Sequence, residues 1–217
     1  MIQKVFVWIL GAILLGSCTT TPPGSKDQQP ASIGKLVKLY GNASAKRNKQ
    51  DRNLTFGSVI YEGDVVMTRA NTRLKIKMTD GTELILGDRT TLVIERYGYQ
   101  KTTREDQAVF RIRQGVFHSK SGRIAKSRPD RFRIKTAFAS IGVKGTEFWG
   151  GFWENGTFDV ALLKGVGVTI GNPAGTVEIN DIGWGTTLVS DTIAPTPPKK
   201  WGQKKLEKAY STISWKN

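Results

Sequence analysis

The sequence predicts an all-β domain built from many short strands. Over residues 33–190, apolar and polar residues alternate in stretches of a few residues, which is the pattern of a strand with one buried face. Turns that contain glycine separate these stretches, and glycine supplies the positive φ that tight turns require. No part of this region has the apolar spacing of a long helix. A sandwich, a barrel and a β-solenoid all fit these observations.

The alternation is clearest in a series of short stretches, taken here in chain order. They are residues 74–78, 83–86, 91–94, 110–113, 132–136, 158–162, 166–170 and 177–179. We expect turns between the strands at residues 62–64, 80–81, 87–88, 114–115 and 164–165, each of which contains a glycine.

The first residues predict an export signal. The apolar run at residues 5–15 is too short to cross a bilayer core, which needs roughly 20 residues. It leads into Leu-Gly-Ser-Cys, which resembles the bacterial lipobox and ends at Cys18, the only cysteine of the chain. The resemblance implies cleavage between Ser17 and Cys18 and acylation of the Cys18 sulfur, and two or three acyl chains hold a protein firmly on a membrane. A plain secretory signal with an incidental cysteine is the alternative.

Composition divides the chain into four segments. Residues 1–17 are the predicted signal peptide, and residues 18–32 are a lipidated N-terminus and tether, with adjacent prolines and no apolar periodicity. The β domain spans residues 33–190, and residues 191–217 form a proline-containing linker and a basic tail.

The tail predicts one short C-terminal helix. Leu206, Ala209, Tyr210 and Ile213 recur at helical spacing, with lysines on the other side. Such a basic amphipathic helix either rests on anionic lipid headgroups or packs back on the domain.

Five motifs over residues 57–190 resemble those of the FecR family and follow one another in the same order. Residues 78–84 resemble the "LPDGS…L" turn, and residues 110–117 resemble "V-x-L-x-x-G-x-x-F". Residues 132–136 resemble "F-x-V-x-T", residues 141–148 resemble "V-x-G-T-x-F", and residues 160–168 resemble the closing "V-x-V-x-x-G-x-V". The motif residues that we single out are Asp80, Gly81, Gly115, Gly145, Thr146, Phe148 and Gly165.

The resemblance implies a short-stranded, β-solenoid-like FecR domain. In membrane-spanning FecR regulators, a cytoplasmic segment holds a sigma factor, and a transmembrane helix joins it to a periplasmic domain that responds to an outer-membrane receptor. This sequence shows neither of these segments. We therefore carry over only the partner-binding half of the family's role.

Strand parity predicts a basic face, because residues two apart lie on one side of a strand. In three strands, lysines and arginines alternate with apolar residues that we expect in the core. If these strands lie together, their outward side chains form an anion-binding or partner-binding surface, which the basic loop at residues 120–128 extends. The predicted surface residues are Lys75, Lys77, Arg111, Arg113, Arg133 and Lys135. A scattered, solvated set of charges is the alternative.

The net charge and the single histidine limit the classes of partner and of catalytic site that the chain can have. A formal net charge of +15 favours anionic partners, and export argues against nucleic acid as the partner. His118 is the only histidine, and Cys18 is expected to be acylated, so we expect no His/Cys metal site and no Cys-His pair. Carboxylate pairs such as Asp80 with Asp88 are available, but turn formation already explains both residues. We therefore predict no catalytic residue, no metal and no cofactor.

We expect a non-catalytic cell-envelope lipoprotein whose FecR-like domain binds an acidic protein or an anionic envelope component. One alternative is an accessory protein in transmembrane signalling that relays receptor state to a separate regulator, and another is a carbohydrate-active enzyme. Thr19 in place of an aspartate after Cys18 resembles the usual pattern for sorting to the outer membrane. The predicted location is therefore the outer membrane, with the domain facing the periplasm.

Overall fold

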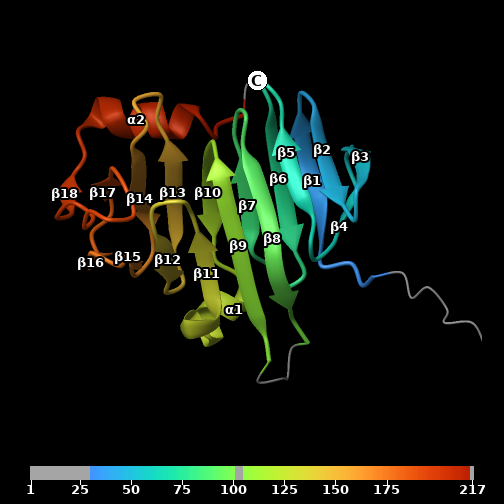
Figure 1. The fold of residues 1–217 in the computed structure, drawn as a ribbon, viewed down its shortest axis with the longest axis horizontal. Helices are drawn as coiled ribbons and strands as arrows, with labels where there is room; N and C mark the ends of the chain where they lie inside the picture. The colour runs from blue at the N-terminus through green and yellow to red at the C-terminus, as the bar shows by residue number, and fades with distance from the viewer. Residues whose placement is uncertain (1–29, 101–104, 216–217) are drawn as a thin grey trace, which may run out of the picture.

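The computed structural model describes residues 30–100 and 105–215, which form two nine-stranded β-sheets that face each other (Figure 1). Sheet A contains, in spatial order, β18 (Lys199–Lys200), β17 (Trp184–Leu188), β14 (Phe158–Lys164), β13 (Glu147–Phe152), β10 (Val116–Lys120), β7 (Glu83–Leu86), β6 (Arg73–Met78), β1 (Gly34–Tyr40) and β4 (Val59–Ile60). Sheet B contains β16 (Gly175–Ile179), β15 (Val168–Asn172), β12 (Ser140–Val143), β11 (Phe132–Lys135), β9 (Gln107–Gln114), β8 (Thr91–Gly98), β5 (Val65–Thr68), β2 (Ala43–Arg47) and β3 (Gln50–Leu54). The helical elements are α1 (Arg123–Ser127), the 3-10 turn η1 (Pro129–Arg131) and α2 (Gln203–Ser211).

The prediction of an all-β domain is confirmed, whereas the solenoid is not. The chain passes between the two sheets one strand or one hairpin at a time and advances from β1–β4 at one end to β17 and β18 at the other (Figure 1). The strands of a parallel β-helix pair in parallel from coil to coil. Here the pairings are antiparallel apart from β9 with β11, where the chain crosses to β10 in sheet A and returns through α1 and η1.

A single apolar core fills the space between the sheets. In β6, Leu74, Ile76 and Met78 point inward and are almost fully buried. In sheet B, the rings of Phe110 in β9 and Phe132 in β11 meet edge to face, with centroids 5.8 Å apart. In β6, β9 and β11, the apolar residues of the predicted alternation therefore form the core, and the basic residues between them point outward. Val166, from the predicted stretch 166–170, is instead 69% exposed.

The residues after 190 pack back onto sheet A, and we call residues 199–215 the C-terminal strap. β18 extends the sheet beyond β17, and α2 then crosses the outer face near one end of the strands (Figure 1). The predicted short C-terminal helix is therefore confirmed. Of its two expected positions, the structure shows the one against the domain.

Apolar contacts and paired polar groups hold the strap in place. Ala209 and Ile213 are buried in an apolar cluster with Trp149 of β13. The Trp149 indole Nε1 donates a hydrogen bond to Thr212 Oγ1 at 2.9 Å. Tyr210, predicted on the same apolar side, is instead 44% exposed. The outer face of sheet A is thus partly covered by the protein's own C-terminus.

The predicted leader, the cleavage site at Ser17 and Cys18, and most of the tether lie outside the described residues. Within the described part of the chain, no helix has the length and apolar character needed to span a membrane.

Candidate functional site

A cluster of lysines lies on the outer face of sheet A beside the strap, whose Trp215 ring has its centroid 4.4 Å from Nζ of Lys38. β1 pairs with β6 so that Lys35 lies opposite Lys77, and Lys38 lies opposite Lys75. Directly opposed residues point to the same side of a sheet at Cβ separations of about 4.5–5.5 Å, where like charges repel. We call Lys35, Lys38, Lys75, Lys77 and, across β7, Lys120 the lysine face.

Two glutamates lie within the lysine face. Glu83 lies opposite Lys77 and Lys120, and its Oε2 is 2.6 Å from Nζ of Lys75. Burial alone would raise the pKa of Glu83, but the hydrogen bond from Lys75 and the charges of the surrounding lysines lower it below its usual range. Glu147 Oε1 lies 3.9 Å from Nζ of Lys120. The lysine face therefore carries both positive and negative side chains, with the positive ones in excess.

His118 lies among these charges without adding to them. It pairs with Ile85 of β7 and Trp149 of β13 in sheet A, and its side chain is only 12% exposed. Burial lowers the pKa of His118, although Glu147, whose Oε2 is 3.7 Å from Nε2, opposes the shift. The ring is therefore neutral at neutral pH.

The structure divides the six predicted surface residues between two opposite faces of the molecule. Lys75 and Lys77 lie in β6 and belong to the lysine face. Arg111, Arg113, Arg133 and Lys135 lie in β9 and β11, which are neighbours in sheet B. Strand parity correctly predicted that these side chains point outward. The prediction that they form one basic surface is wrong, because the strands belong to two different sheets.

On sheet B most of the predicted cations are paired within the protein. Glu95 of β8 accepts hydrogen bonds from Arg111 and from Lys135, the latter at 3.2 Å. Burial would raise the pKa of Glu95, but these two cations lower it. Arg133 donates to two nearby backbone carbonyl oxygens at 2.7 and 2.9 Å. Arg113 is left as the exposed cation of this group.

Lys35 and Lys38 belong to the site but were missed by the sequence reasoning. The register of β1 with β6 shifts between Leu36 and Lys38, so the two lysines are an odd number of residues apart. Strict alternation does not detect such a strand, because a bulge inserts an extra residue and changes the parity. The signal that could have found it is the pair of lysines around an apolar dipeptide.

The motif residues Asp80 and Gly81 form the turn between β6 and β7. Gly81 has a φ of +86°, and the Asp80 carboxylate is buried. It accepts hydrogen bonds from the Thr82 amide at 3.0 Å, the Tyr97 hydroxyl at 2.9 Å and the Ile124 amide at 3.2 Å. Asp80 therefore ties the hairpin to β8 and α1, which is a structural task.

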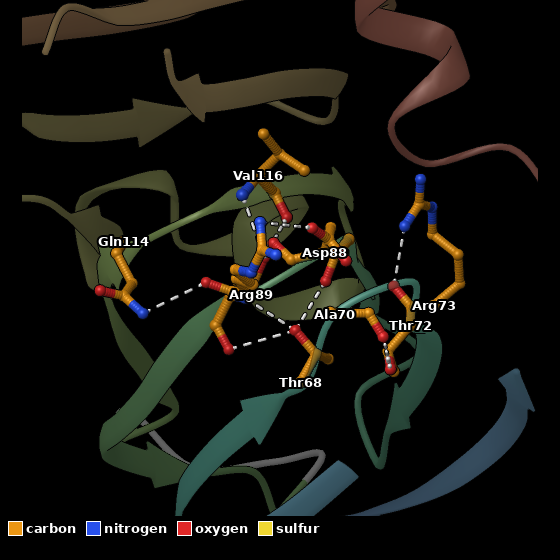
Figure 2. Close-up of polar contacts among 10 residues, drawn as sticks. Thr68, Ala70, Thr72, Arg73, Asp88, Arg89, Gln114 and Val116 are labelled. Atoms are coloured by element: carbon orange, nitrogen blue, oxygen red, sulfur yellow. Dashed lines mark hydrogen bonds and ion pairs between the residues drawn. The ribbon is translucent and has the colours of Figure 1, made fainter. Parts of the chain in front are cut away.

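Gly115 lies where two turns meet at the other end of these strands. Its φ is +87°, and a Cβ there would lie 2.4 Å from the Thr90 Cα. Thr90 Oγ1 donates to the Val116 carbonyl at 2.9 Å and accepts from the Val116 amide at 3.0 Å. Figure 2 shows this contact beside Thr68, whose hydroxyl accepts from the Thr90 amide at 2.7 Å. Only glycine fits between these strands.

Gly145, Thr146 and Gly165 form a second close approach. Thr146 Oγ1 donates to the Gly167 carbonyl at 2.9 Å, and a Cβ on Gly165 would lie 2.7 Å from the Gly145 carbonyl oxygen. Phe148, two residues after Thr146, is fully buried in the core. The motif residues thus form turns, close backbone approaches and core rings, all of which are structural tasks.

The described residues hold no group of three or more His, Cys, Asp or Glu placed to bind a metal ion. Asp80 and Asp88 lie at opposite ends of β7, so they do not form a carboxylate pair.

Comparison with known proteins identifies one family. Residues 64–166 match the model of the family described as FecR protein. Two crystal structures of a candidate anti-sigma factor from Parabacteroides distasonis resemble this fold, with TM-scores of 0.52 and 0.50 at 18% and 16% sequence identity. Each match covers 66% of this chain and 62% of that chain, so this protein spans less than two thirds of those relatives. No curated protein matches the sequence.

Proposed function

Because residues 64–166 of this chain form a FecR domain, we propose that the protein is a non-catalytic signalling module of the cell envelope that binds an acidic surface of a partner protein. The FecR domain is the single observation that carries this proposal, since it supports a regulatory role in transmembrane signalling. The partner is a receptor or a separate regulator, and the module relays the state of one to the other.

The lysine face is the surface that we propose for docking. Lys35 with Lys77 and Lys38 with Lys75 form opposed like-charge pairs, whose repulsion an acidic partner would relieve. Complementary charge of this kind chiefly speeds association and fixes the orientation of the partner.

The pattern of charges favours a protein over a uniform polyanion. Along one row across sheet A, Lys77, Glu83, Lys120 and Glu147 follow one another on successive strands. A protein surface can place acidic groups against the lysines and basic groups against the glutamates. An anionic envelope polymer would instead meet repulsion at both glutamates.

We also propose that the chain reaches this location as a lipoprotein. The leader at residues 1–17 would be removed, Cys18 acylated, and residues 18–32 would hold the domain away from an outer membrane, on its periplasmic side. Residues 33–190 would form the β domain, and residues 191–217 would supply the linker and tail. Labelling with radioactive palmitate tests the anchor, and replacement of Cys18 by serine (Cys18→Ser) should abolish the label and release the protein from membranes.

Photo-crosslinking in intact envelopes tests the docking surface. The test variant replaces Lys35, Lys38, Lys75 and Lys77 by serine, and the matched control replaces Arg111, Arg113, Arg133 and Lys135 by serine. We expect the first variant to lose crosslinks to an acidic receptor or regulator and the second to retain them. Equal capture by both variants would contradict the assignment of the face, and capture of peptidoglycan or lipopolysaccharide as the main product would favour the polymer instead.

A further inference from the structure

A polar groove runs along the end of the sandwich beside the C-terminal strap. It adjoins the lysine face, because Tyr40 and Arg73 of its wall form the next outward pair after Lys38 and Lys75 in β1 and β6. It consists of three adjoining hollows of about 180, 750 and 500 Å³. The first and second share Arg73 and Asp88 in their walls, and the second and third share Trp153, Asn155 and Lys208. The hollows therefore adjoin one another in a row.

The walls of the groove are held firmly by the protein. Thr68 Oγ1 donates to the Gly87 carbonyl at 2.6 Å, and the Thr90 contacts described above join the same turns (Figure 2). Gln114 Nε2 donates to the Arg89 carbonyl at 3.3 Å. Arg73 Nη1 donates to the Thr72 carbonyl at 2.8 Å, which orients the guanidinium (Figure 2). A ligand in this groove would meet side chains that are already positioned.

Two polar atoms in these walls lack a partner among the described residues. Nε of Arg73 and Oδ1 of Asp88 are both buried and make no hydrogen bond there. The other carboxylate oxygen of Asp88 is 3.6 Å from Nη1 of Arg89, which is a loose ion pair. Burial lowers the pKa of Arg73, although the charge of Asp88 opposes the shift. Buried polar atoms without partners are uncommon in folded proteins and call for a group from outside the chain.

The chemistry of the walls favours a ligand that both donates and accepts hydrogen bonds. The largest hollow is lined by cations and carboxylates together, namely Arg73, Arg89, Lys208, Asp88 and Glu154, and by the amides of Gln114 and Asn155. A bare anion would meet two carboxylates, and a bare cation would meet three positive charges. A hydroxyl group can accept from an arginine and donate to an aspartate at once.

One aromatic ring in the groove is open to a ligand. Tyr40 lines the first hollow and is 49% exposed. Trp153 is not available for stacking, because Trp149 lies at 5.2 Å between ring centroids and Lys208 Nζ lies 4.6 Å from its ring. An exposed tyrosine can cover the apolar face of a sugar ring while its hydroxyl stays in water.

We propose that this groove binds a glycan, with Arg73 and Asp88 bonding to adjacent sugar hydroxyls and Tyr40 stacking on a neighbouring ring. The groove adjoins the lysine face but shares none of its lining residues with it, so it gives the protein a second ligand of different chemistry. A module with both sites connects a protein partner to an envelope polysaccharide.

Pelleting of the full-length protein with insoluble chitin, cellulose and purified peptidoglycan sacculi tests the proposal. We expect binding to at least one of them that survives high salt, and a loss of about tenfold or more in affinity for Asp88→Ala and for Tyr40→Ala. Asp88 makes only the loose ion pair with its side chain, and Tyr40 is half exposed, so both variants should keep the wild-type melting temperature.

Matched controls remove the same groups elsewhere on the surface. Asp130→Ala removes an exposed carboxylate in η1, and Phe56→Ala removes a ring that is 79% exposed. Both controls should bind like the wild type. Failure of the wild type to bind any of the three polysaccharides would overturn the proposal, as would binding that Asp88→Ala and Tyr40→Ala leave unchanged. Binding that high salt abolishes in all variants alike would show charge attraction and would also overturn it.

Discussion

Both outer faces of the sandwich carry basic side chains, but the positive charges are balanced differently on the two faces. On sheet B, Glu95 lies between Arg111 and Lys135 and accepts from both. On sheet A, lysines lie opposite lysines at the β1–β6 pairing, and the strap covers the apolar remainder of the face.

The difference shows that strand register, more than the number of charges, decides where a binding surface lies. The same alternation of basic and apolar residues occurs in β6, β9 and β11. Its outcome depends on the strands around it: Glu95 of β8 binds cations of both β9 and β11, whereas β6 lies between Glu83 of β7 and the lysines of β1.

Replacement of Trp149 by alanine (Trp149→Ala) should destabilise the protein most. Trp149 is fully buried between sheet A and the strap, packs on Trp201 with centroids 6.0 Å apart, and donates to Thr212. Removal of a buried aromatic side chain costs about 3–5 kcal/mol. Urea unfolding followed by circular dichroism would measure the change.

A matched pair of valines isolates the contribution of the strap. Val116 of sheet A is buried under it, whereas Val109 of sheet B lies on the outward side of β9 and is only partly buried. Val116→Ala should cost about 1–3 kcal/mol and Val109→Ala less than about 1 kcal/mol. Equal losses at the two positions would show that the strap adds nothing to the stability of sheet A.

Replacement of Glu95 by glutamine (Glu95→Gln) should make sheet B resemble sheet A. The change removes the shared acceptor of Arg111 and Lys135, and it should cost about 1–2 kcal/mol because the carboxylate is only partly exposed. The freed cations should also increase binding to heparin resin at low salt. Glu178→Gln, at an exposed position in β16, provides the control and should change neither property.

The pH dependence of this effect has a defined sign. Because the two cations lower the pKa of Glu95 in the folded state, its contribution to stability is present above the usual value of 4.5 and is lost as the pH falls through the lowered value. Glu95→Gln should remove that part of the acid-induced loss. An unchanged acid limb in the variant would contradict the role assigned to Glu95.

Charge reversal should have opposite effects on the two faces. Lys35→Glu turns the repulsive pair with Lys77 into an attractive one and should stabilise the protein by about 0.5 kcal/mol. Arg111→Glu places a second carboxylate beside Glu95 and should lower the stability of the protein. Thermal unfolding at low and high salt would measure both shifts, and both should shrink at high salt. A fall in stability for Lys35→Glu would show that the opposed lysines do not repel.

The sequence predicts which side chains of each strand are buried and which point outward, but it does not predict which strands pair with one another. Leu74, Ile76 and Met78 are buried as their alternation predicts, because a strand has only two sides. The placement of β6 in sheet A and of β9 and β11 in sheet B depends on crossovers that local periodicity does not encode. For this reason strand parity identified the outward cations, but it could not show that some belong to sheet A and the others to sheet B.

The candidate site was predictable to a similar extent. Lys75 and Lys77 came from alternation, whereas Lys35 and Lys38 depend on a bulge in β1 that becomes visible only with its partner strand. The groove was out of reach, because Tyr40, Arg73, Asp88 and Trp153 come from turns and strands far apart in the sequence. The helical spacing of the tail predicted α2, but not the aromatic cluster on which it packs.

The smallest expected effect concerns His118, which lies on the lysine face but is buried in its neutral form. Burial lowers its pKa from 6.5, so the unfolded chain binds the proton more readily, and folding stability should fall as the pH drops below that value. Glu83 and Glu95, whose pKa values are lowered from 4.5, contribute only at more acidic pH. Urea titrations of wild type and His118→Gln between about pH 7 and pH 5 would isolate this term, since the variant should show a flatter dependence. Parallel curves would mean that the ring takes up its proton as readily in the folded protein as in the unfolded chain, and the lysine face would then gain a positive charge as the pH falls through 6.5.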